Sequence, residues 1–367
     1  MYPINRSVRA VLLAGAAMTF GMGFAPVQQA MAQQTAQTGA TIASLPPALR
    51  AAVQSGNAPV IQQTIQTLSG GNPQQAGALS NAVIRVAEQL LATNPQAAIA
   101  AAAAAVEIVR NTGVQTSAPQ QTESVVTTAA RIFVSPSAVA TNPNATSALA
   151  TATLSVAQAS QGPAVLASVA NAAVNTAERI VQTNPAAAVQ LAAQAVQSVS
   201  ATSTAQAAPT QVSQVATTAA RIIVTPEAAR VAPQAVATVA ISVTQIVSNP
   251  AVYQAAPAAA IQVMASAYTA VSQPTVQAAS PEASATVVST LTAASTNVAL
   301  NQTNATNPAQ INQILARPTT TTTTTTTTQT AQQPQATTTQ TQQTNTNTNT
   351  NTNPPVEETP ILTGSPI

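Results

Sequence analysis

The residues on which most enzyme chemistry depends are missing from this sequence of 367 residues. It contains no Cys, His, Asp, Lys or Trp, so its charged side chains are ten arginines and eight glutamates. A Ser-His-Asp or Cys-His arrangement is therefore impossible within the chain, and so is a zinc site built from the usual nitrogen and sulfur ligands. A glycine-rich phosphate loop followed by lysine is also absent. We expect no catalytic residues, no metal site and no cofactor, and we predict that the protein is not an enzyme.

Glu88 and Glu178 are the two carboxylates that we weigh as a catalytic pair, because they lie 90 residues apart at matching positions. A pair of carboxylates that face one another is the arrangement used by glycoside hydrolases. The repetition itself offers a simpler explanation, namely that both residues occupy the same exposed position of a repeated helix. We therefore assign neither of them a catalytic role.

The arginines also follow a repetitive pattern. Arg131 and Arg221 each lie at the end of a repeated helical pattern, where a positive charge interacts favourably with the helix dipole. A ligand-binding role for these two arginines is the alternative. Three further pairs of opposite charge are spaced three residues apart, which predicts weak surface ion pairs on helices. These pairs are Arg85 with Glu88, Glu107 with Arg110, and Glu227 with Arg230.

Prolines mark the helices that must position these charges. Three prolines each open an alanine-rich run, and each is followed 24 residues later by a second proline. The pairs are Pro95 and Pro119, Pro185 and Pro209, and Pro257 and Pro281. Proline suits the first turn of a helix, because its missing N–H has no intrahelical partner there. Asn94 and Asn184 precede the first two runs and are suited to cap them, whereas Ala256 takes this place in the third.

Each alanine-rich run carries a stripe of apolar residues spaced three, four and three residues apart. The three stripes are Ile99, Ala102, Val106 and Val109, then Val189, Ala192, Val196 and Val199, and finally Ile261, Met264, Tyr268 and Val271. This spacing places four apolar side chains on one face of a helix. We predict that Ile99, Val189 and Ile261 are equivalent and point into the core.

These patterns predict an all-α fold, an alanine-rich helical repeat that forms a solenoid or an elongated bundle. A repeat of about 90 residues that holds about four helices accounts for the matched positions. β-rich structure is the alternative, since valine and threonine both lower helix propensity. The predicted boundaries are a flexible or short-helix segment at 33–72, repeats at 73–162 and 163–248, a shortened repeat at 249–317 and a disordered tail at 318–367.

The first 32 residues have the pattern of a secretory signal peptide. Arg6 and Arg9 form a short positive region, Val11–Met18 is a short apolar segment, and Ala30–Ala32 is a small-x-small cleavage site. The apolar segment is far shorter than the roughly 20 residues that span a bilayer, although a short N-terminal anchor is the alternative. Cleavage would leave a mature protein that begins at Gln33 and is exported to the periplasm, the cell surface or the medium.

The mature chain would be formally neutral, because eight arginines and eight glutamates follow the signal peptide. Net charge near zero favours association over colloidal repulsion. This composition also lacks the basic surface that nucleic acids require, so we expect no nucleic-acid partner. The longest unbroken apolar run after the signal peptide, 97–106, is too short to cross a bilayer, so we expect no integral membrane span.

A polar low-complexity segment begins at Pro318. Ten threonines run from Thr319 to Thr328, and Gln, Asn and Thr then alternate up to Asn353. Such a composition cannot bury enough apolar surface to fold, which predicts a disordered tail. Both a glycosylated stalk and a bare spacer are compatible with it. Residues 354–367 break the bias with acidic and apolar side chains, either as a docking motif or as an ordinary solvated terminus.

Taken together, the sequence predicts an exported, non-enzymatic structural or interaction protein of the cell envelope or the secreted fraction. It would present a neutral helical repeat surface for assembly or adhesion, with the C-terminal segment as a flexible tether. Protein partners or self-association are expected, and contact with a surface polymer is a further option. The alternatives are a membrane-perturbing helical protein and an ice- or surface-binding protein that uses Ala and Thr on helix faces.

Overall fold

The computed structural model of the protein describes residues 41–317, and within this range the chain is helical almost throughout. Twenty α-helices and one short 3-10 helix (Ile42–Ser44) account for the regular structure, and these residues contain no β-strand. The predicted all-α fold is therefore confirmed, and the β-rich alternative is wrong for this range. The predicted signal peptide (1–32), the start of the mature chain at Gln33 and the predicted tail (318–367) lie outside the described residues.

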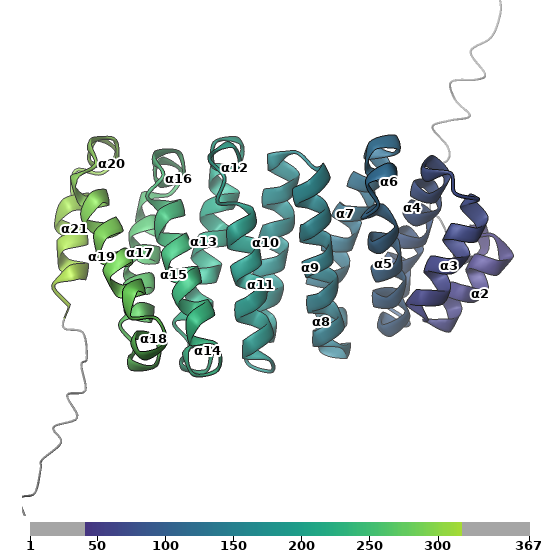
Figure 1. The fold of residues 1–367 in the computed structure, drawn as a ribbon, viewed down its shortest axis with the longest axis horizontal. Helices are drawn as coiled ribbons and strands as arrows, with labels where there is room; N and C mark the ends of the chain where they lie inside the picture. The colour runs from purple at the N-terminus through teal and green to yellow at the C-terminus, as the bar shows by residue number, and fades with distance from the viewer. Residues whose placement is uncertain (1–40, 318–367) are drawn as a thin grey trace, which may run out of the picture. The chain divides into compact units, whose positions relative to one another are not determined.

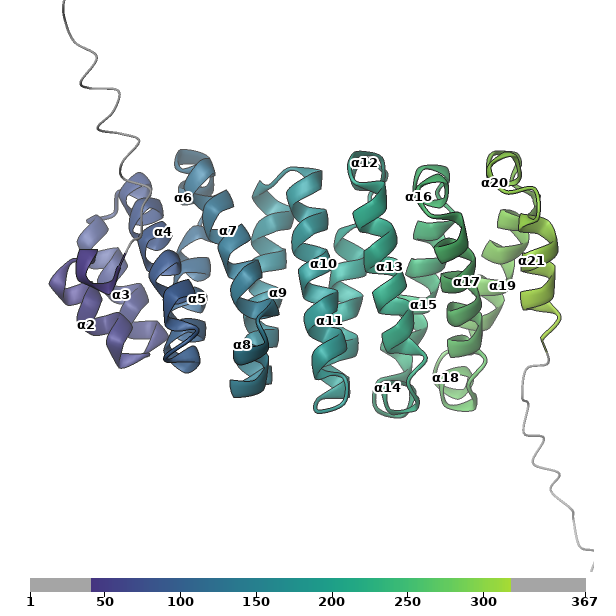
Figure 2. The same cartoon turned by 180° about the vertical axis from the view of Figure 1, so that it is seen from behind.

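The long helices form two layers, and the chain alternates between them (Figures 1 and 2). Layer A contains α4 (Pro73–Leu90), α7 (Pro119–Val134), α10 (Pro163–Ile180), α13 (Pro209–Ile223), α17 (Pro257–Val271) and α21 (Asn307–Leu315). Layer B contains α3 (Ala58–Ser69), α5 (Pro95–Val109), α9 (Pro143–Ser160), α11 (Pro185–Ser198), α15 (Pro233–Val247) and α19 (Pro281–Thr296). Each long helix packs against the next long helix of the chain, in the other layer, and against the one after that, in its own layer. α2 (Pro47–Ser55) packs on α3 at the N-terminal end.

Six-residue helices link most of the long ones and lie along two edges of the layers (Figure 1). One edge carries α6 (Thr112–Ser117), α12 (Thr202–Ala207), α16 (Pro250–Ala255) and α20 (Val298–Thr303). The opposite edge carries α8 (Pro136–Thr141), α14 (Pro226–Val231) and α18 (Pro274–Ala279). The turns from α3 to α4, from α4 to α5, from α9 to α10 and from α10 to α11 contain no such helix.

Local sequence explains where the long helices begin. Proline occupies the first turn of every long helix, as the spacing of prolines predicted. The Asn94 side chain accepts a hydrogen bond from the Ala97 N–H at 3.0 Å, and that of Asn184 accepts one from the Ala187 N–H at 3.1 Å. Ala256 makes no side-chain cap at the start of α17. The predicted caps are therefore confirmed in the first two alanine-rich runs.

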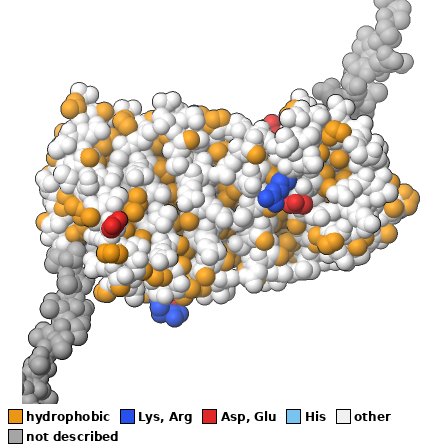
Figure 3. Space-filling view, in the orientation of Figure 1, with side chains coloured by type: hydrophobic (Ala, Val, Ile, Leu, Met, Phe, Trp, Pro, Cys, Tyr) orange, Lys and Arg blue, Asp and Glu red, His pale blue; other side chains and the backbone are white. Residues whose placement is uncertain are grey.

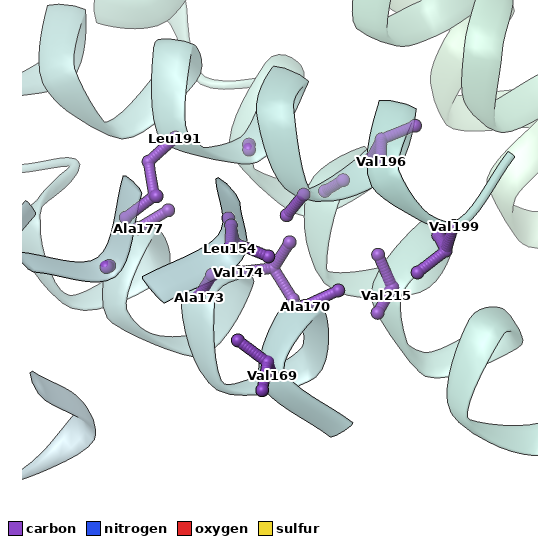
Figure 4. Packing of buried hydrophobic residues seen from close by; sticks show 14 of the residues in the cluster. Leu154, Val169, Ala170, Ala173, Val174, Ala177, Leu191, Val196, Val199 and Val215 are labelled. Atoms are coloured by element: carbon purple, nitrogen blue, oxygen red, sulfur yellow. The ribbon is translucent and has the colours of Figure 1, made fainter. Parts of the chain in front are cut away.

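The predicted apolar stripes face the core between the layers. Ile99 is 2% exposed and Val189 is fully buried, whereas Ile261 is only partly buried and packs at the edge of the core. Alanine fills much of the remaining interior, and Figure 4 shows alanine, valine and leucine side chains of neighbouring helices meeting there. Small side chains let helix axes approach at the short end of the usual range of about 8–10 Å.

The third stripe belongs to a helix of the other layer. The stripes of Ile99 and Val189 lie on α5 and α11, which both belong to layer B. The stripe of Ile261 lies on α17, which packs between α13 and α21 in layer A. The 3-4-3 spacing therefore identifies a buried helix face and does not distinguish the two layers.

The helices at the two ends of the described array expose both polar and apolar side chains. α2 and α3 expose Gln54 and Gln63 together with Ala48, Ala51 and Val60, and α21 exposes Asn312 and Gln313 together with Ala309. None of the helices in residues 41–317 combines the length and hydropathy needed to cross a bilayer.

Candidate functional site

The two repeated carboxylates are used in contacts between helices. Glu88, near the end of α4, binds Arg131 of α7 through two hydrogen bonds, Nε to Oε1 at 2.7 Å and Nη2 to Oε2 at 3.1 Å. Arg131 Nη2 also donates to Thr128 Oγ1 at 3.1 Å. The hydrogen bond to Glu88 raises the pKa of Arg131 above its usual value.

The same constellation recurs 90 residues later in the next pair of layer A helices. Arg221 Nε of α13 lies 3.0 Å from Glu178 Oε1 of α10. Arg221 Nη2 also donates a hydrogen bond to Thr218 Oγ1 at 3.4 Å. α7 lies between α4 and α10, so the two carboxylates stand on helices that do not pack directly against one another. The structure thus places Glu88 and Glu178 in two separate ion pairs, each with one of the repeated arginines.

The ion pairs predicted from a spacing of three residues have mixed outcomes. Glu107 and Arg110 form the predicted pair at 3.4 Å. The predicted pair of Arg85 with Glu88 is wrong, because Arg131 binds both oxygens of Glu88 and Arg85 donates instead to Asn81 Oδ1 at 3.2 Å. No ion pair joins the residues predicted on α14, Glu227 and Arg230, in the described part of the chain.

The surface of the helical array is poor in charge. Figure 3 shows that uncharged and apolar side chains cover almost all of the face seen in Figure 1. Within residues 41–317 no group of three or more acidic side chains converges as a metal site would require. The remaining features that could recognise another molecule are therefore hollows of this neutral surface.

A groove follows the exposed face of α5, between α3 and α9. One part has a volume of about 840 Å³, and its floor includes Ala100 and Ala103 of α5 together with Ala148 and Ala152 of α9. A second part of about 580 Å³ continues toward the C-terminal end of α5 and the start of α4. Gln62 and Glu107 line both parts, so the two hollows adjoin along α5.

The lining of the groove is neutral and lacks aromatic side chains. The larger part is lined mainly by apolar side chains, together with the carboxamides of Asn57, Gln62 and Gln96. The smaller part is lined mostly by polar side chains, among them Gln66 and Asn72. Glu107 and Arg110 are the ionisable residues of the lining, and they neutralise one another. Both side chains are about half exposed, at 48% and 57%, so water screens their charges strongly.

One alanine distinguishes the groove surface of α5 from its counterpart. α11 begins 90 residues after α5 and carries the exposed Gln190 at the position of Ala100, whereas the position of Ala103 is again an alanine, Ala193. Near it, Gln194 Oε1 accepts a hydrogen bond from Thr151 Oγ1 of α9 at 2.9 Å. A long side chain therefore stands on α11 where the methyl group of Ala100 lines the groove on α5. Sequence reasoning missed this groove, although the difference between Ala100 and Gln190 was visible in the aligned copies.

A buried polar cluster joins the last helices of the array. The Tyr253 hydroxyl of α16 donates to Asn307 Oδ1 at 2.9 Å and accepts from Asn304 Nδ2 at 3.2 Å. Asn307 Nδ2 in turn donates to the Ala294 carbonyl at 3.0 Å and to Asn301 Oδ1 at 2.8 Å. Burial raises the pKa of Tyr253 above its usual value of 10.0. The cluster holds α21 against α16 and α19, and its hydrogen bonds are satisfied within the chain.

Searches against models of known protein families, curated proteins and solved structures found no match to this chain.

Proposed function

We propose that this protein is an exported, non-enzymatic interaction protein of the cell envelope or the secreted fraction, and that it binds its partners through a neutral helical surface. The observation that supports the proposal is the scarcity of charge on a surface otherwise rich in amide, hydroxyl and methyl groups. Between 231 and 316 the chain carries a single charged residue, Glu282. A surface without strong net charge permits close association with other neutral surfaces, because little electrostatic repulsion opposes it.

In this proposal, assembly or adhesion uses the broad faces of layers A and B. The groove over α5 lies on the face of layer B.

The helical array is built, in this proposal, from a repeat of about 90 residues with four long helices. Four pairs of helices support it, since α4 and α10, α5 and α11, α7 and α13, and α9 and α15 each begin 90 residues apart. The two matching Glu–Arg contacts support it as well. The repeats would span 73–162 and 163–248, and 249–317 would form a shortened third repeat.

Export and the tether are proposals that rest on sequence alone. The signal peptide would end at Ala32, and the polar segment from Pro318 would connect the helical array to residues 354–367. Protein partners or a second copy of the chain are the expected ligands, and a neutral surface polymer is the further option.

Fractionation of cells that express the full chain with a C-terminal tag tests this proposal. We expect the protein in the periplasm, on the cell surface or in the medium, and mass spectrometry should find its N-terminus at Gln33. A protein that stays in the cytoplasm with residues 1–32 intact would overturn the proposed export. Recovery of the exported protein free of any partner, at its native level, would overturn the interaction function.

A further inference from the structure

We propose that the groove over α5 binds a helix of a partner protein, and that the contacting face of this helix is uncharged and carries small apolar residues three and four positions apart. The inference deepens the proposed interaction function and rests on it, because it names the class of partner for one part of the neutral surface. Three properties of the groove support this occupant: its charge, its floor and its counterpart at α11.

The charge of the groove selects an uncharged partner. Its single carboxylate, from Glu107, is matched by the guanidinium of Arg110 at 3.4 Å. A charged partner surface would lose hydration here without meeting a net opposite charge. The lining also lacks aromatic side chains on which a sugar or a base would stack, and it has no cluster of arginines for phosphate groups.

The floor of the groove selects a helix over an extended peptide. The methyl groups of Ala100, Ala103, Ala148 and Ala152 offer no hydrogen-bond partners to a peptide backbone. An extended strand lying on them would bury N–H and C=O groups without partners, which is costly. A helix satisfies these groups internally. The groove follows α5 from Gln96 to Glu107. These two residues are eleven positions apart, which corresponds to about 16 Å, or three helical turns.

The fold already uses the packing that the proposal requires. In the interior, alanines of α10 such as Ala170, Ala173 and Ala177 meet valine and leucine side chains of the neighbouring helices (Figure 4). Alanine at such contacts allows helix axes to approach closely. A helix docked over α5 would repeat this packing as a third layer.

The counterpart of the groove explains why one site, and not two, is proposed. Gln190 of α11 stands where α5 has Ala100, and Gln194 is held across the surface by Thr151. A helix approaching α11 would have to displace these side chains. Binding should therefore depend on the small size of the residue at 100. Ala103 lines the same floor, although its counterpart on α11, Ala193, is also alanine.

A peptide titration of the mature protein tests the inference. The probe is a labelled synthetic peptide with the α11 sequence, Pro185–Ser198, which has no charged residue and is locked into a helix by a covalent staple. A peptide of the same composition in scrambled order is its control. We expect saturable binding of one helical peptide per chain, and about ten-fold weaker binding of the scrambled peptide, as measured by fluorescence anisotropy. The affinity should change little between about 50 and 500 mM salt, because no net charge is involved.

Substitutions that copy the α11 surface complete the test. Ala100→Gln should weaken binding of the helical peptide about ten-fold or more, and Ala103→Gln should act in the same direction. Ala193→Gln places the same side chain at the position of α11 that matches Ala103, and it should leave the affinity unchanged. Circular dichroism should show the same helix content for all variants.

Several results would overturn the inference. These are the absence of binding, equal affinity for the scrambled peptide, and full affinity of the Ala100→Gln variant. A dimer of the protein that Ala100→Gln dissociates would also overturn it, since a second copy would then be the occupant. Cell fractionation separates these failures from a failure of the proposed function, because export and recovery with a partner do not depend on the peptide.

Discussion

Two regions of the described helical array differ in the polar contacts that join neighbouring helices. Toward the N-terminus, exposed ion pairs join α4 to α7 and α10 to α13. Toward the C-terminus, charge almost disappears, and a buried cluster around Tyr253 and Asn307 joins α16, α19 and α21. Layer geometry is the same in both regions, so the alanine-rich core determines the fold and the polar contacts adjust it.

The difference between the regions lies in how water competes with each contact. The arginines of the ion pairs are more than half exposed, at 60% and 56%, so water solvates both partners when the pair opens. Asn307 is fully buried, and loss of its partner leaves a polar atom without water. Exposed ion pairs contribute about 0.2–1 kcal/mol, whereas an unsatisfied buried group costs about 1–3 kcal/mol. The region with fewer charges should therefore depend more on its individual polar residues.

The largest effect is expected from a charge placed in the core that both regions share. Val189 is fully buried in α11. Val189→Asp would place a carboxylate in the core, and α11 takes part in none of the ion pairs within residues 41–317. We expect a loss of more than about 4 kcal/mol in the free energy of unfolding, measured by urea denaturation. Hydrogen exchange should show the loss centred on α9, α10, α11 and α15, with α3 and α21 less affected.

Gln190→Asp is the control for Val189→Asp, because the neighbouring side chain is exposed on the same helix. It should change stability by no more than about 0.5 kcal/mol. Equal destabilisation by both substitutions would contradict the burial of the stripe. Uniform loss of protection along the whole array would contradict the expectation that the loss centres on the helices around α11.

Tyr253→Phe breaks the contact that distinguishes the C-terminal region. The substitution removes the hydroxyl that donates a hydrogen bond to Asn307 Oδ1, and it leaves this buried oxygen unpaired. We expect a loss of about 1–3 kcal/mol in urea denaturation, with early exchange of α21. Tyr268 is also buried but makes no side-chain hydrogen bond within residues 41–317, so Tyr268→Phe should have a smaller effect. A stronger effect of the control would argue against the cluster as the main link to α21.

The same tyrosine should make the C-terminal region sensitive to alkaline pH. Burial raises the pKa of Tyr253 in the folded chain above the value of 10.0 expected when unfolded. The unfolded chain therefore releases the proton first, so stability is complete below about pH 10 and falls as the pH rises through the folded pKa. Thermal unfolding between pH 8 and about pH 11 should show this fall, and Tyr253→Phe should reduce it. An unchanged pH profile in the variant would assign the effect to other groups.

The smallest effect is expected at the ion pairs of the N-terminal region. A double-mutant cycle with Glu88→Gln and Arg131→Gln should give a coupling energy of about 0.2–1 kcal/mol that decreases at high salt. The matched cycle at Glu178 and Arg221 should give a similar value, since the geometry and exposure are similar. A coupling as large as the effect of Tyr253→Phe would reverse the comparison between the two regions.

Much of the local structure could be predicted from the sequence. Prolines at the helix starts, asparagine caps and the 3-4-3 stripes act within one or two helical turns, so they are visible in a short window of residues. Ile99 and Val189 are buried as their spacing predicted, and Glu107 pairs with Arg110 within one helix. The candidate groove could not be predicted in this way, because its walls come from α3, α5 and α9.

The sequence by itself determined the type of every long helix and which face of it turns inward, because backbone hydrogen bonds and side-chain periodicity are local properties. Only the tertiary structure decided in which layer a helix lies. It placed Ile261, on α17, in layer A, whereas Ile99 and Val189 lie on helices of layer B. It also chose Arg131 over Arg85 as the partner of Glu88, because α4 and α7 pack side by side and bring together two residues that are 43 positions apart in the chain. Such contacts depend on how close helix axes come, and in this chain the small size of alanine sets that distance.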